Sequence, residues 1–423
     1  MNILILGSGG REHTFCWKLS QSPKCKNLYV SPGNAGTAAI ATNLGIPVLD
    51  FESLKVAIIK NEIQMVVVGP EAPLVEGIKE FFQSDSQLSK VALIGPNSEA
   101  AKLEGSKSYA KKFMSKYKIP TAKYSEFTSS SLSQAFKFLE TMAPPYVLKA
   151  DGLAGGKGVL IIEDIDKAKK ELKSMLVKKK FGKASEKVVI EEFLNGIELS
   201  CFIISDGKTG ITFPMAKDYK RVGEADSGLN TGGMGAVSPV PFVDIEFQKK
   251  IDEKIIKPTL RGLKSENMLY QGFIFIGLIN VDGEPMVIEY NVRMGDPETE
   301  VVIPRIKNDF VSLFQAVSNQ KLKTIKLKID KRVAVTVMSV SGGYPEKYNK
   351  GYVIKGLENV KDAVIFHSGT IVEGDKVVTN GGRVLTLTGL GNSMQEALKK
   401  SYKGLKEIQF KEMYYRKDIG FDL

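Results

Sequence analysis

One glycine-rich run constrains the fold more than any other part of the chain. Residues 147–162 begin as an apolar stretch, cross a loop with four glycines and Lys157, and end in a second apolar, β-branched stretch. Glycines let a backbone wrap closely around a ligand, and freed N–H groups can face an anion. A Walker A loop would place Ser or Thr after the lysine and open a helix, whereas Gly158 and a strand-like stretch follow here. The run predicts a phosphate-binding flap between antiparallel strands, with an ordinary hairpin loop as the alternative.

Length and composition limit the class of protein. A chain of 423 residues with 43% hydrophobic residues is expected to form about three domains. We expect a cytoplasmic protein with no membrane partner, because no apolar run is long enough to span a bilayer and the N-terminus has no signal-peptide pattern. The three cysteines are scattered and the two histidines are far apart in sequence, which argues against disulfides and histidine-based metal sites.

The net charge of +11 raises the question of nucleic acid. The lysines are dispersed, and no basic stripe interleaved with aromatic residues is present, so we expect no nucleic-acid partner. The expected partners are small molecules, and a monomer is the expected state.

The first hundred residues alternate strand and helix patterns. Strand-like segments at residues 3–6, 27–30, 65–68 and 91–94 each run into a loop of glycine, proline or both, and helical patterns cover residues 12–21 and 98–118. This alternation predicts a parallel α/β sheet whose ligand binds at the carboxyl ends of the strands.

The remainder is of mixed α+β type. Beyond the flap, a lysine-rich helix is predicted at 165–180, strands at 188–192, 272–280 and 286–291, and helices near 244–265 and 308–320. The basic tract 324–332 is a plausible linker. Strands at 333–340 and 383–388 and a helix at 393–408 then predict a small α+β closing domain.

The turn after the first strand, Gly7-Ser8-Gly9-Gly10, resembles a dinucleotide fingerprint. A Rossmann site usually has an acid at the end of the second strand, where this chain has Ser31-Pro32-Gly33, so a dehydrogenase is disfavoured. The turn can still hold a phosphate at a helix N-terminus, or be a tight strand–helix turn with no ligand.

Glu289 and Asn291 point to one face of a strand and offer two oxygen donors, a set that suits Mg²⁺ held mostly by phosphate oxygens and water. Arg293 and Asp296 follow around a glycine turn, within the run 293–300. The alternative to a metal site is an edge strand whose polar side chains face solvent. We favour a metal–phosphate site.

Two further segments carry polar groups near glycines. Lys220 and Arg221 precede the glycine-rich stretch 226–236, a combination that suits an anionic group or, alternatively, a long surface loop. The stretch 191–198 lies where a strand ends in a turn. Its backbone could bind the edge of an adenine, and Glu198 could bind a ribose. The alternative is an ordinary strand end with solvated acids, which would give the same pattern.

In this order, a glycine-rich flap, a Glu-Glu-Phe-Leu turn and a Glu-x-Asn strand resemble the ATP-grasp superfamily. Within it, the chain is similar over essentially its whole length to the glycinamide ribonucleotide synthetase family, also called phosphoribosylamine–glycine ligases. The motifs that carry this likeness are Gly9-Gly10-Arg11-Glu12-His13, Pro32-Gly33-Asn34-Ala35-Gly36-Thr37, Gly69-Pro70-Glu71-Ala72-Pro73-Leu74, Leu103-Glu104-Gly105-Ser106-Lys107, Asn230-Thr231-Gly232-Gly233-Met234-Gly235-Ala236, Gly295-Asp296-Pro297-Glu298-Thr299 and Thr379-Asn380-Gly381-Gly382-Arg383-Val384.

The resemblance implies a domain plan. It predicts an α/β and α+β multidomain chain with a Rossmann-like substrate domain at 1–105 and an ATP-grasp lid subdomain with the flap at 106–190. A catalytic and metal subdomain at 191–325 and a C-terminal α+β domain at 326–423 complete it.

The resemblance also implies an activity: ATP-dependent joining of glycine to 5-phosphoribosylamine through glycyl phosphate, in de novo purine synthesis. The implied catalytic residues are Arg293, Lys157 and Asp296, and the implied ligands of Mg²⁺ or Mn²⁺ are Glu289 and Asn291. ATP would be held by Lys107, Lys149, Gly152, Gly155, Gly156, Lys157, Glu191, Phe193, Leu194 and Glu198. Substrates would be held by Gly10, Arg11, Glu12, Asn34, Pro70, Glu71, Asp218, Lys220, Arg221, Gly295 and Asp296.

Two departures from the family pattern stand out. Gly155 replaces an expected alanine in the flap, and Tyr219 replaces a common histidine. The strand 272–280 offers no second acidic metal ligand. Another ATP-grasp carboxylate–amine ligase or carboxylase is the alternative function, and a nucleotide-binding sensor without catalysis is a third reading.

Overall fold

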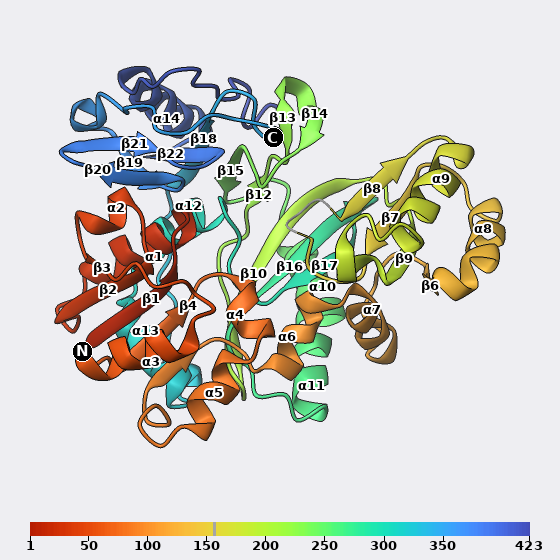
Figure 1. Ribbon diagram of the computed structural model, residues 1–423, viewed down its shortest axis with the longest axis horizontal. Coiled ribbons are helices and arrows are strands. Elements are labelled where there is room, and N and C mark those ends of the chain that lie inside the picture. The colour runs from red at the N-terminus through yellow and green to blue at the C-terminus, as the bar shows by residue number, and fades with distance from the viewer. Residues whose placement is uncertain (155–157) are drawn as a thin grey trace.

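The computed structural model describes residues 1–154 and 158–423. Its sheets gather in three regions, which Figure 1 colours red to orange, yellow to cyan and blue along the chain.

The N-terminal region is built on one parallel sheet of order β3-β2-β1-β4-β5. Residues 3–6 of its central strand are fully buried, because helices cover both faces, and this accounts for their unbroken apolar run. The predicted parallel α/β sheet is confirmed, with an extra short strand, β3. The strands are β1 (Asn2–Gly7), β2 (Asn27–Pro32), β3 (Thr42–Asn43), β4 (Met65–Val68) and β5 (Ala92–Ile94), and the helices are α1 (Gly10–Ser20), α2 (Ala35–Ala38), α3 (Phe51–Lys60), α4 (Glu71–Val75) and α5 (Ile78–Ser84).

The helix expected at 98–118 is wrong as a single element. The chain forms α6 (Ser98–Gly105) and α7 (Lys107–Lys116), which break at Ser106. Ser106 has an extended backbone, and its side chain accepts a hydrogen bond from the Tyr109 N–H and donates to Asp151 at 3.0 Å. The break therefore places Lys107 in the first turn of α7, beside the base of the flap.

The flap is attached to an antiparallel sheet of order β6-β9-β7-β8. Its two flanking strands, β7 and β8, pair directly, which confirms that strands and not a helix follow the loop. The predicted flap residues Gly155, Gly156 and Lys157 lie outside the described residues. The elements here are β6 (Tyr124–Thr128), β7 (Tyr146–Ala150), β8 (Val159–Ile162), β9 (Lys187–Glu192), α8 (Leu132–Glu140) and α9 (Ile165–Leu176), the last shorter than the predicted 165–180.

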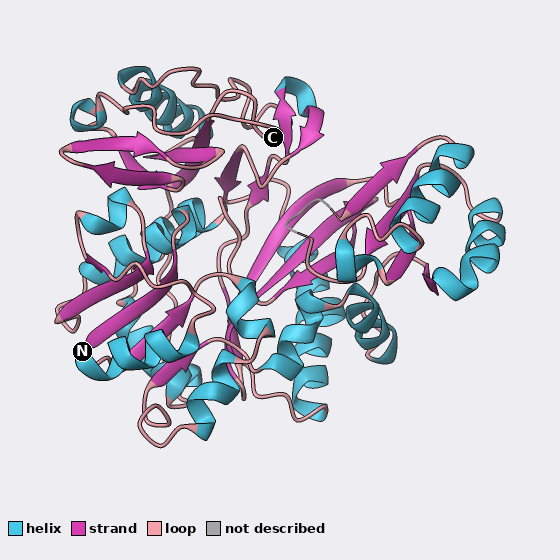
Figure 2. Ribbon diagram, viewed as in Figure 1, coloured by secondary structure: helices cyan, strands magenta, loops and turns pink. Residues whose placement is uncertain are grey.

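A second antiparallel sheet, of order β11-β10-β16-β17, carries the predicted metal strand at its edge. Figure 2 shows this sheet beside the flap sheet, and Thr121 bridges to Val287 of β17 between them. The predicted helix near 244–265 is continuous, with a π-helical turn at its centre. The elements are β10 (Ile197–Asp206), β11 (Gly210–Thr212), β16 (Gln271–Val281), β17 (Glu284–Asn291), α10 (Ile245–Ile251), η4 (Asp252–Ile256), α11 (Lys257–Ser265), α12 (Thr299–Val302) and α13 (Phe310–Ser318).

The C-terminal sheet has the order β12-β15-β18-β22-β19, so two strands from the middle of the chain complete it. Its long helix, α14 (Met394–Glu407), packs on β18 and β22. The strands are β12 (Lys217–Asp218), β15 (Gly235–Ser238), β18 (Val333–Val340), β19 (Ala363–His367) and β22 (Arg383–Gly391), with hairpins β13 (Arg221–Gly223)–β14 (Ser227–Asn230) and β20 (Thr370–Glu373)–β21 (Lys376–Thr379). Short turns are η1 (Ser129–Ser131), η2 (Gly182–Ser185), η3 (Glu224–Asp226), η5 (Ile303–Arg305), η6 (Leu322–Thr324) and η7 (Leu357–Asn359).

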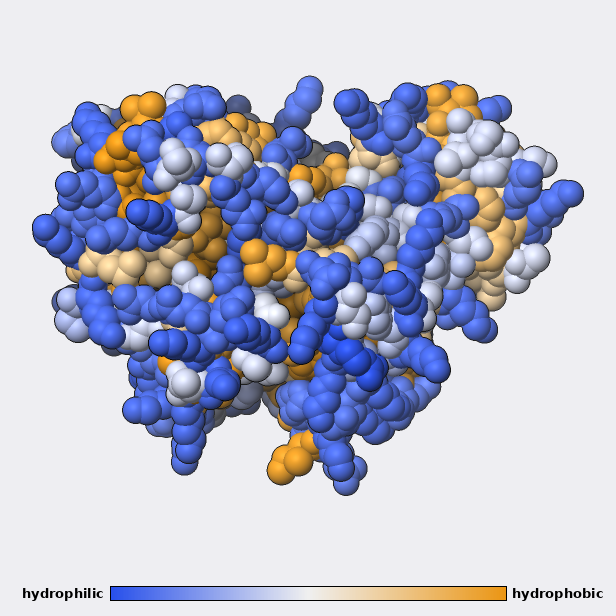
Figure 3. All heavy atoms as spheres, turned by 90° about the horizontal axis from the view of Figure 1, so that it is seen from below, coloured by the Kyte–Doolittle hydropathy of each residue, from blue (hydrophilic) through white to orange (hydrophobic). Residues whose placement is uncertain are grey.

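The face in Figure 3 is largely hydrophilic, with small separate apolar patches. Across residues 1–154 and 158–423, no helix combines the length and apolar character needed to cross a bilayer.

Candidate active site

Glu289 and Asn291 lie at the end of β17, next to β16 in the antiparallel sheet. Gly277 faces Glu289 across this pair, and a side chain there would come within 3.3 Å of the Glu289 Cγ. Burial opposes ionisation of Glu289, but the ammonium groups of Lys220, Lys149 and Lys107 lower its pKa overall. Three lysines from separate elements thus lie close enough to act on the charge of this carboxylate, and such a cluster of cations suits a multiply charged phosphate.

One of these lysines is held by a buried ion-pair group. The Glu191 Oε2 lies 2.9 Å from the Lys149 Nζ and 3.0 Å from the Lys111 Nζ, and all three side chains are almost fully buried. Lys149 also donates to the Ile288 carbonyl at 3.3 Å, which ties the flap sheet to the metal strand. The Glu191 side chain therefore orients Lys149, while its backbone belongs to the strand end predicted to face adenine.

Lys220 faces a different acid. Its ammonium pairs with Glu198 on β10, and both side chains are about half exposed. Partial loss of solvent around Lys220 lowers the pKa of its ammonium group, but the neighbouring carboxylates of Asp218 and Glu198 outweigh this effect, so the net shift is well upward and Lys220 stays charged. The predicted ribose residue and a predicted substrate residue are thus in direct contact.

Arg11 and Glu12 lie in the first turn of α1, just after the carboxyl end of β1 in the N-terminal sheet. The Arg11 Nε donates to Glu12 at 2.7 Å, and the Gly9 N–H donates to the same carboxylate at 2.6 Å. A side chain at Gly69 would come within 1.9 Å of the Glu12 Oε1, so this glycine makes room for the acid.

Asp296 joins all three regions. It accepts from the Arg11 N–H at 3.1 Å and lies 3.0 Å from the guanidinium of Arg383, which comes from the C-terminal sheet. Arg383 also donates to the Gly232 carbonyl at 2.6 Å and thereby holds the glycine-rich stretch against the Asp296 turn.

Arg293 lies between two acids of the N-terminal region. Its Nε is 3.2 Å from Glu71 and its Nη2 is 2.8 Å from Glu104. Burial of the Glu104 carboxyl raises its pKa to about 7, against the opposing pull of Arg293.

The other predicted residues are placed as follows. Asn34 caps α2, and its amide also donates to the carbonyls of Ser8 and His367, so its side chain is occupied in holding loops together. Arg221 donates to the Gly228 carbonyl at 2.8 Å, so its guanidinium is used within its own hairpin. Gly10 and Pro70 open helices α1 and α4, Gly152 packs on Ala184, Gly295 packs on Glu298, and Phe193 and Leu194 follow β9.

Tyr219, where the resemblance led us to expect a histidine, is buried. Its hydroxyl donates to Asp422 at 2.8 Å, and its ring stacks under the Lys217 ammonium. Here it is part of the C-terminal packing.

The oxygen donors of Glu289 and Asn291 fit a hard divalent cation whose remaining ligands are phosphate oxygens and water. Glu289 and Asn291 are two residues apart at the end of β17, so the Glu289 carboxylate and the buried Asn291 amide, whose Oδ1 can bind a cation, share one face of the strand. The same residues contain no group of three or more His, Cys, Asp or Glu arranged for a metal. Two oxygen donors with further coordination from phosphate and water match Mg²⁺ or Mn²⁺.

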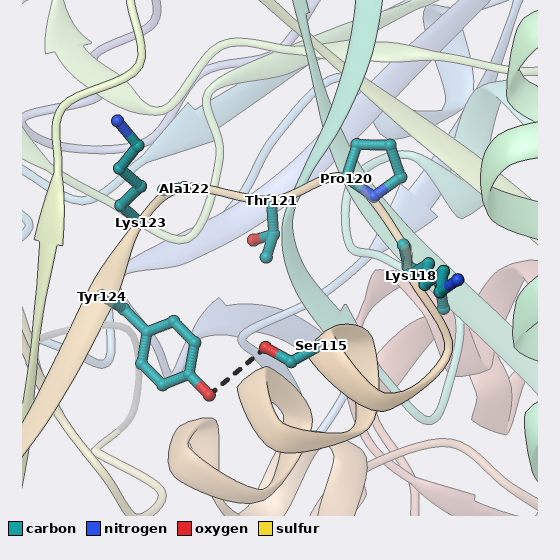
Figure 4. A pocket seen from close by; sticks show the side chains of 8 residues that line it. Ser115, Lys118, Pro120, Thr121, Ala122, Lys123 and Tyr124 are labelled. Atoms are coloured by element: carbon teal, nitrogen blue, oxygen red, sulfur yellow. Dashed lines mark hydrogen bonds between the residues drawn. The ribbon is translucent and has the colours of Figure 1, made fainter.

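A separate pocket lies where α7 leads into β6. It is lined by Ser115 and residues 118–124, and Figure 4 shows the Tyr124 hydroxyl reaching towards Ser115. Lys111 reaches the same segment through Thr121 at 2.8 Å. None of the sequence-predicted site residues lines this pocket.

Sequence reasoning assigned no role to three residues that the structure brings to the site: Lys111, Glu104 and Arg383. Lys111 stands four residues after Lys107 on one helix face, a signal that was present in the sequence. Glu104 and Arg383 belong to motifs that carry the family resemblance, but only the tertiary contacts reveal their partners.

The paired antiparallel sheets, with their lysines around a Glu-x-Asn strand, define an ATP-grasp fold. Family models for the N domain, the ATP-grasp (A) domain and the C domain of phosphoribosylglycinamide synthetase match residues 1–104, 105–299 and 334–422. The chain belongs to the phosphoribosylglycinamide synthetase family.

Individual relatives agree. The chain is 43% identical over 420 residues to a phosphoribosylamine–glycine ligase of Caldanaerobacter subterraneus, covering 99% of each chain, and 43% identical over 426 residues to that of Pseudomonas aeruginosa, covering 100% of this chain and 98% of the other. The crystal structure of the Thermotoga maritima phosphoribosylamine–glycine ligase matches with a TM-score of 0.86 at 36% identity, over 99% of this chain and 100% of that one. A biotin carboxylase domain of Hydrogenobacter thermophilus shares the fold, with a TM-score of 0.73 at 13% identity and coverage of 98% and 91%.

Proposed function

We propose that this protein joins glycine to 5-phosphoribosylamine, with cleavage of ATP to ADP and phosphate. The observation that carries the proposal is the match of all three family domains to this chain, in which Lys107, Lys149 and Lys220 lie close enough to lower the pKa of Glu289.

Glycine carboxylate is a poor acyl donor and must be activated first. Its oxygen attacks the γ-phosphorus of ATP, which gives glycyl phosphate and ADP, and the amine of phosphoribosylamine then displaces phosphate. No protein nucleophile is needed, so the protein contributes positioning and charge stabilisation. Lys107 and Lys149 are proposed to bind ATP phosphates, Arg293 to steady the transferred phosphoryl group, and Lys157 of the flap to complete the phosphate site.

Glu289 and Asn291 would hold Mg²⁺ or Mn²⁺. When bound, this ion would neutralise charge on the phosphate oxygens. Around it, Glu191 keeps Lys149 in place, and Glu198, Phe193 and Leu194 are proposed to contact ribose and adenine.

The Arg11–Glu12 pair and the Asp296 turn are proposed to bind phosphoribosylamine and glycine. Both lie at the carboxyl ends of the parallel strands, where open α/β sheets bind ligands. Asp218, on β12, and the adjacent Lys220 are proposed to complete this substrate site, and closure of the flap would shield the acyl phosphate from water.

The test is phosphate release from ATP with Mg²⁺ in the presence of glycine, phosphoribosylamine, or both. We expect release that requires both substrates and stops on chelation of the metal. Full replacement of glycine by alanine or bicarbonate would instead indicate another ligase or a carboxylase. The double variant Glu289→Gln/Asn291→Ala should keep its thermal midpoint and lose turnover, and near-normal turnover in it would contradict the metal assignment.

We further infer a cytoplasmic monomer that works on small molecules without nucleic acid. Light scattering coupled to size-exclusion chromatography would reveal a dimer if that inference is wrong.

A further inference from the structure

We infer that Glu104 is a positioning residue that holds Arg293 in the geometry needed for phosphoryl transfer. This inference rests on the proposed function, because that function gives Arg293 its role. Glu104 belongs to the N-terminal region, at the end of α6, whereas Arg293 follows the metal strand β17.

The Glu104 carboxylate contacts the arginine segment at two points. Its Oε2 accepts from the Val292 N–H at 2.7 Å, and its Oε1 lies 2.8 Å from the Arg293 Nη2. One side chain thus fixes both the backbone before Arg293 and the direction of its guanidinium. A carboxylate that binds a guanidinium at an ordinary surface site would fix only the direction of the guanidinium and not the backbone beside it.

The support beneath Glu104 is rigid. Its helix neighbours Ala100, Ala101 and Leu103 are buried in the core cluster that includes the strands of the metal sheet. The Glu104 side chain itself is 7% exposed. A carboxylate mounted on such a helix has little freedom to release its partner.

Glu71 differs in this respect. It also binds Arg293, at 3.2 Å through Nε, but its side chain is 29% exposed and stands on the first turn of α4. The two acids occupy the Nε and Nη2 of Arg293, and an incoming phosphoryl group would need one of these donor positions. The more exposed Glu71 is the exchangeable partner, and Glu104 is the permanent one.

The experiment compares Glu104→Gln with the matched control Glu80→Gln in the full-length protein. Glu80 is a partly buried acid of the same region that accepts from the Ser98 N–H at 2.8 Å and has no contact with Arg293. Glutamine at 104 can still accept from the Val292 N–H but cannot pair with the guanidinium. We expect kcat to fall roughly 10- to 100-fold with KM for ATP changed less than about twofold. The control should stay within about twofold of wild type in both.

A double-variant cycle separates positioning from general loss of structure. In an Arg293→Gln background, Glu104→Gln should cause no further fall in kcat, because the group on which it acts is gone. Additive losses in the cycle would overturn the inference, as would an unchanged kcat in the single variant.

If Glu104→Gln fails to fold, judged by its thermal midpoint, Glu104→Asp replaces it. Aspartate keeps the charge and shortens the reach, so the same fall in kcat is expected, and wild-type kcat would overturn the inference. The wild-type protein decides the underlying function independently. Phosphate release that needs both substrates, together with normal kcat in the Glu104 variants, would remove the inference and leave the function standing.

Discussion

At the scale of single residues, the site depends on space as much as on charge. Glu12 anchors the loop at the mouth of the N-terminal sheet through the Gly9 N–H, and it can do so only because Gly69 and Gly7 have no side chain. The sequence analysis interpreted the turn at residues 7–10 as a possible phosphate site. The structure adds that Gly7, in this turn, and Gly69, in another loop, leave space for the Glu12 side chain, a use that no local pattern could have specified.

The two histidines pack against each other between the first and last regions of the chain. The His367 N–H donates to the His13 Nδ1 at 2.8 Å, and the ring centroids lie 5.5 Å apart. Burial lowers the pKa of His13 to about 3, with a further contribution from His367, and lowers that of His367 to about 4. Both rings are therefore neutral at physiological pH, and the His13 Nδ1 acts as a hydrogen-bond acceptor.

We predict an acid-sensitive contribution from His367. The unfolded chain takes up its proton as pH falls below about 6.5, whereas the folded chain resists until about pH 4, so the stabilising contribution is complete above pH 6.5 and declines below it. The stability advantage of wild type over His367→Phe should shrink by about 2 kcal/mol in total, or about 1 kcal/mol per pH unit, between pH 6.5 and 4.5. Urea unfolding at several pH values measures this difference, and parallel curves for the two proteins would contradict it.

At the scale of elements, burial and turn chemistry decided which predictions succeeded. The strand at 3–6 was predictable because its residues are apolar and fully buried, and strand pairing confirmed the sequence pattern on both sides of the flap. The long helix at 98–118 failed because its pattern continues across Gly105-Ser106, while the Ser106 side chain forms a cap and bonds to Asp151, 45 residues away. A helix cap that depends on a distant partner leaves only a weak local signal.

The hairpin β13–β14 illustrates how an element can be held from outside. Arg416, from the C-terminal tail, is fully buried and pairs with Asp226 at 2.6 Å and Asp418 at 2.8 Å, and it donates to the Arg221 carbonyl at 3.1 Å. We predict that Arg416→Met destabilises the protein by about 2–3 kcal/mol, because two acids lose their partner, although the half-exposed Asp226 can be rehydrated.

The measurement is the urea midpoint, with the exposed neighbour Lys417→Met as control. The control should change stability by less than about 0.5 kcal/mol. An equal effect of the two substitutions would show that Arg416 is not the anchor of the hairpin.

At the scale of the whole molecule, the sequence indicated the composition of the site but not its assembly. Glu289 and Asn291 were recognisable because residues two apart share a strand face. The contact between Glu104 and Val292 joins positions 188 apart, and that between Arg383 and Asp296 joins positions 87 apart. Such contacts follow from the packing of the three regions, which periodicity within any one region does not determine.

Arg383 gives this assembly a measurable consequence. It binds the Asp296 carboxylate at 3.0 Å and the carbonyls of Asp296 and Gly232 at 2.7 and 2.6 Å, and so holds two loops of the proposed substrate site from the C-terminal sheet. Arg383→Gln loses the ion pair and the forked geometry. We predict that KM for phosphoribosylamine rises at least about tenfold, or about 1.4 kcal/mol, while KM for ATP stays within about twofold.

Steady-state kinetics with each substrate varied in turn tests this prediction. Arg332→Gln is the control, since Arg332 pairs with Asp330, away from the Asp296 turn, and is half exposed. If KM for ATP rose as much as KM for phosphoribosylamine, Arg383 would support the whole fold and not the substrate loops. A rise in KM for phosphoribosylamine alone would mean that the C-terminal domain is part of the substrate site. This domain supplies none of the predicted ATP or metal residues, and it would act by fixing the shape of two loops.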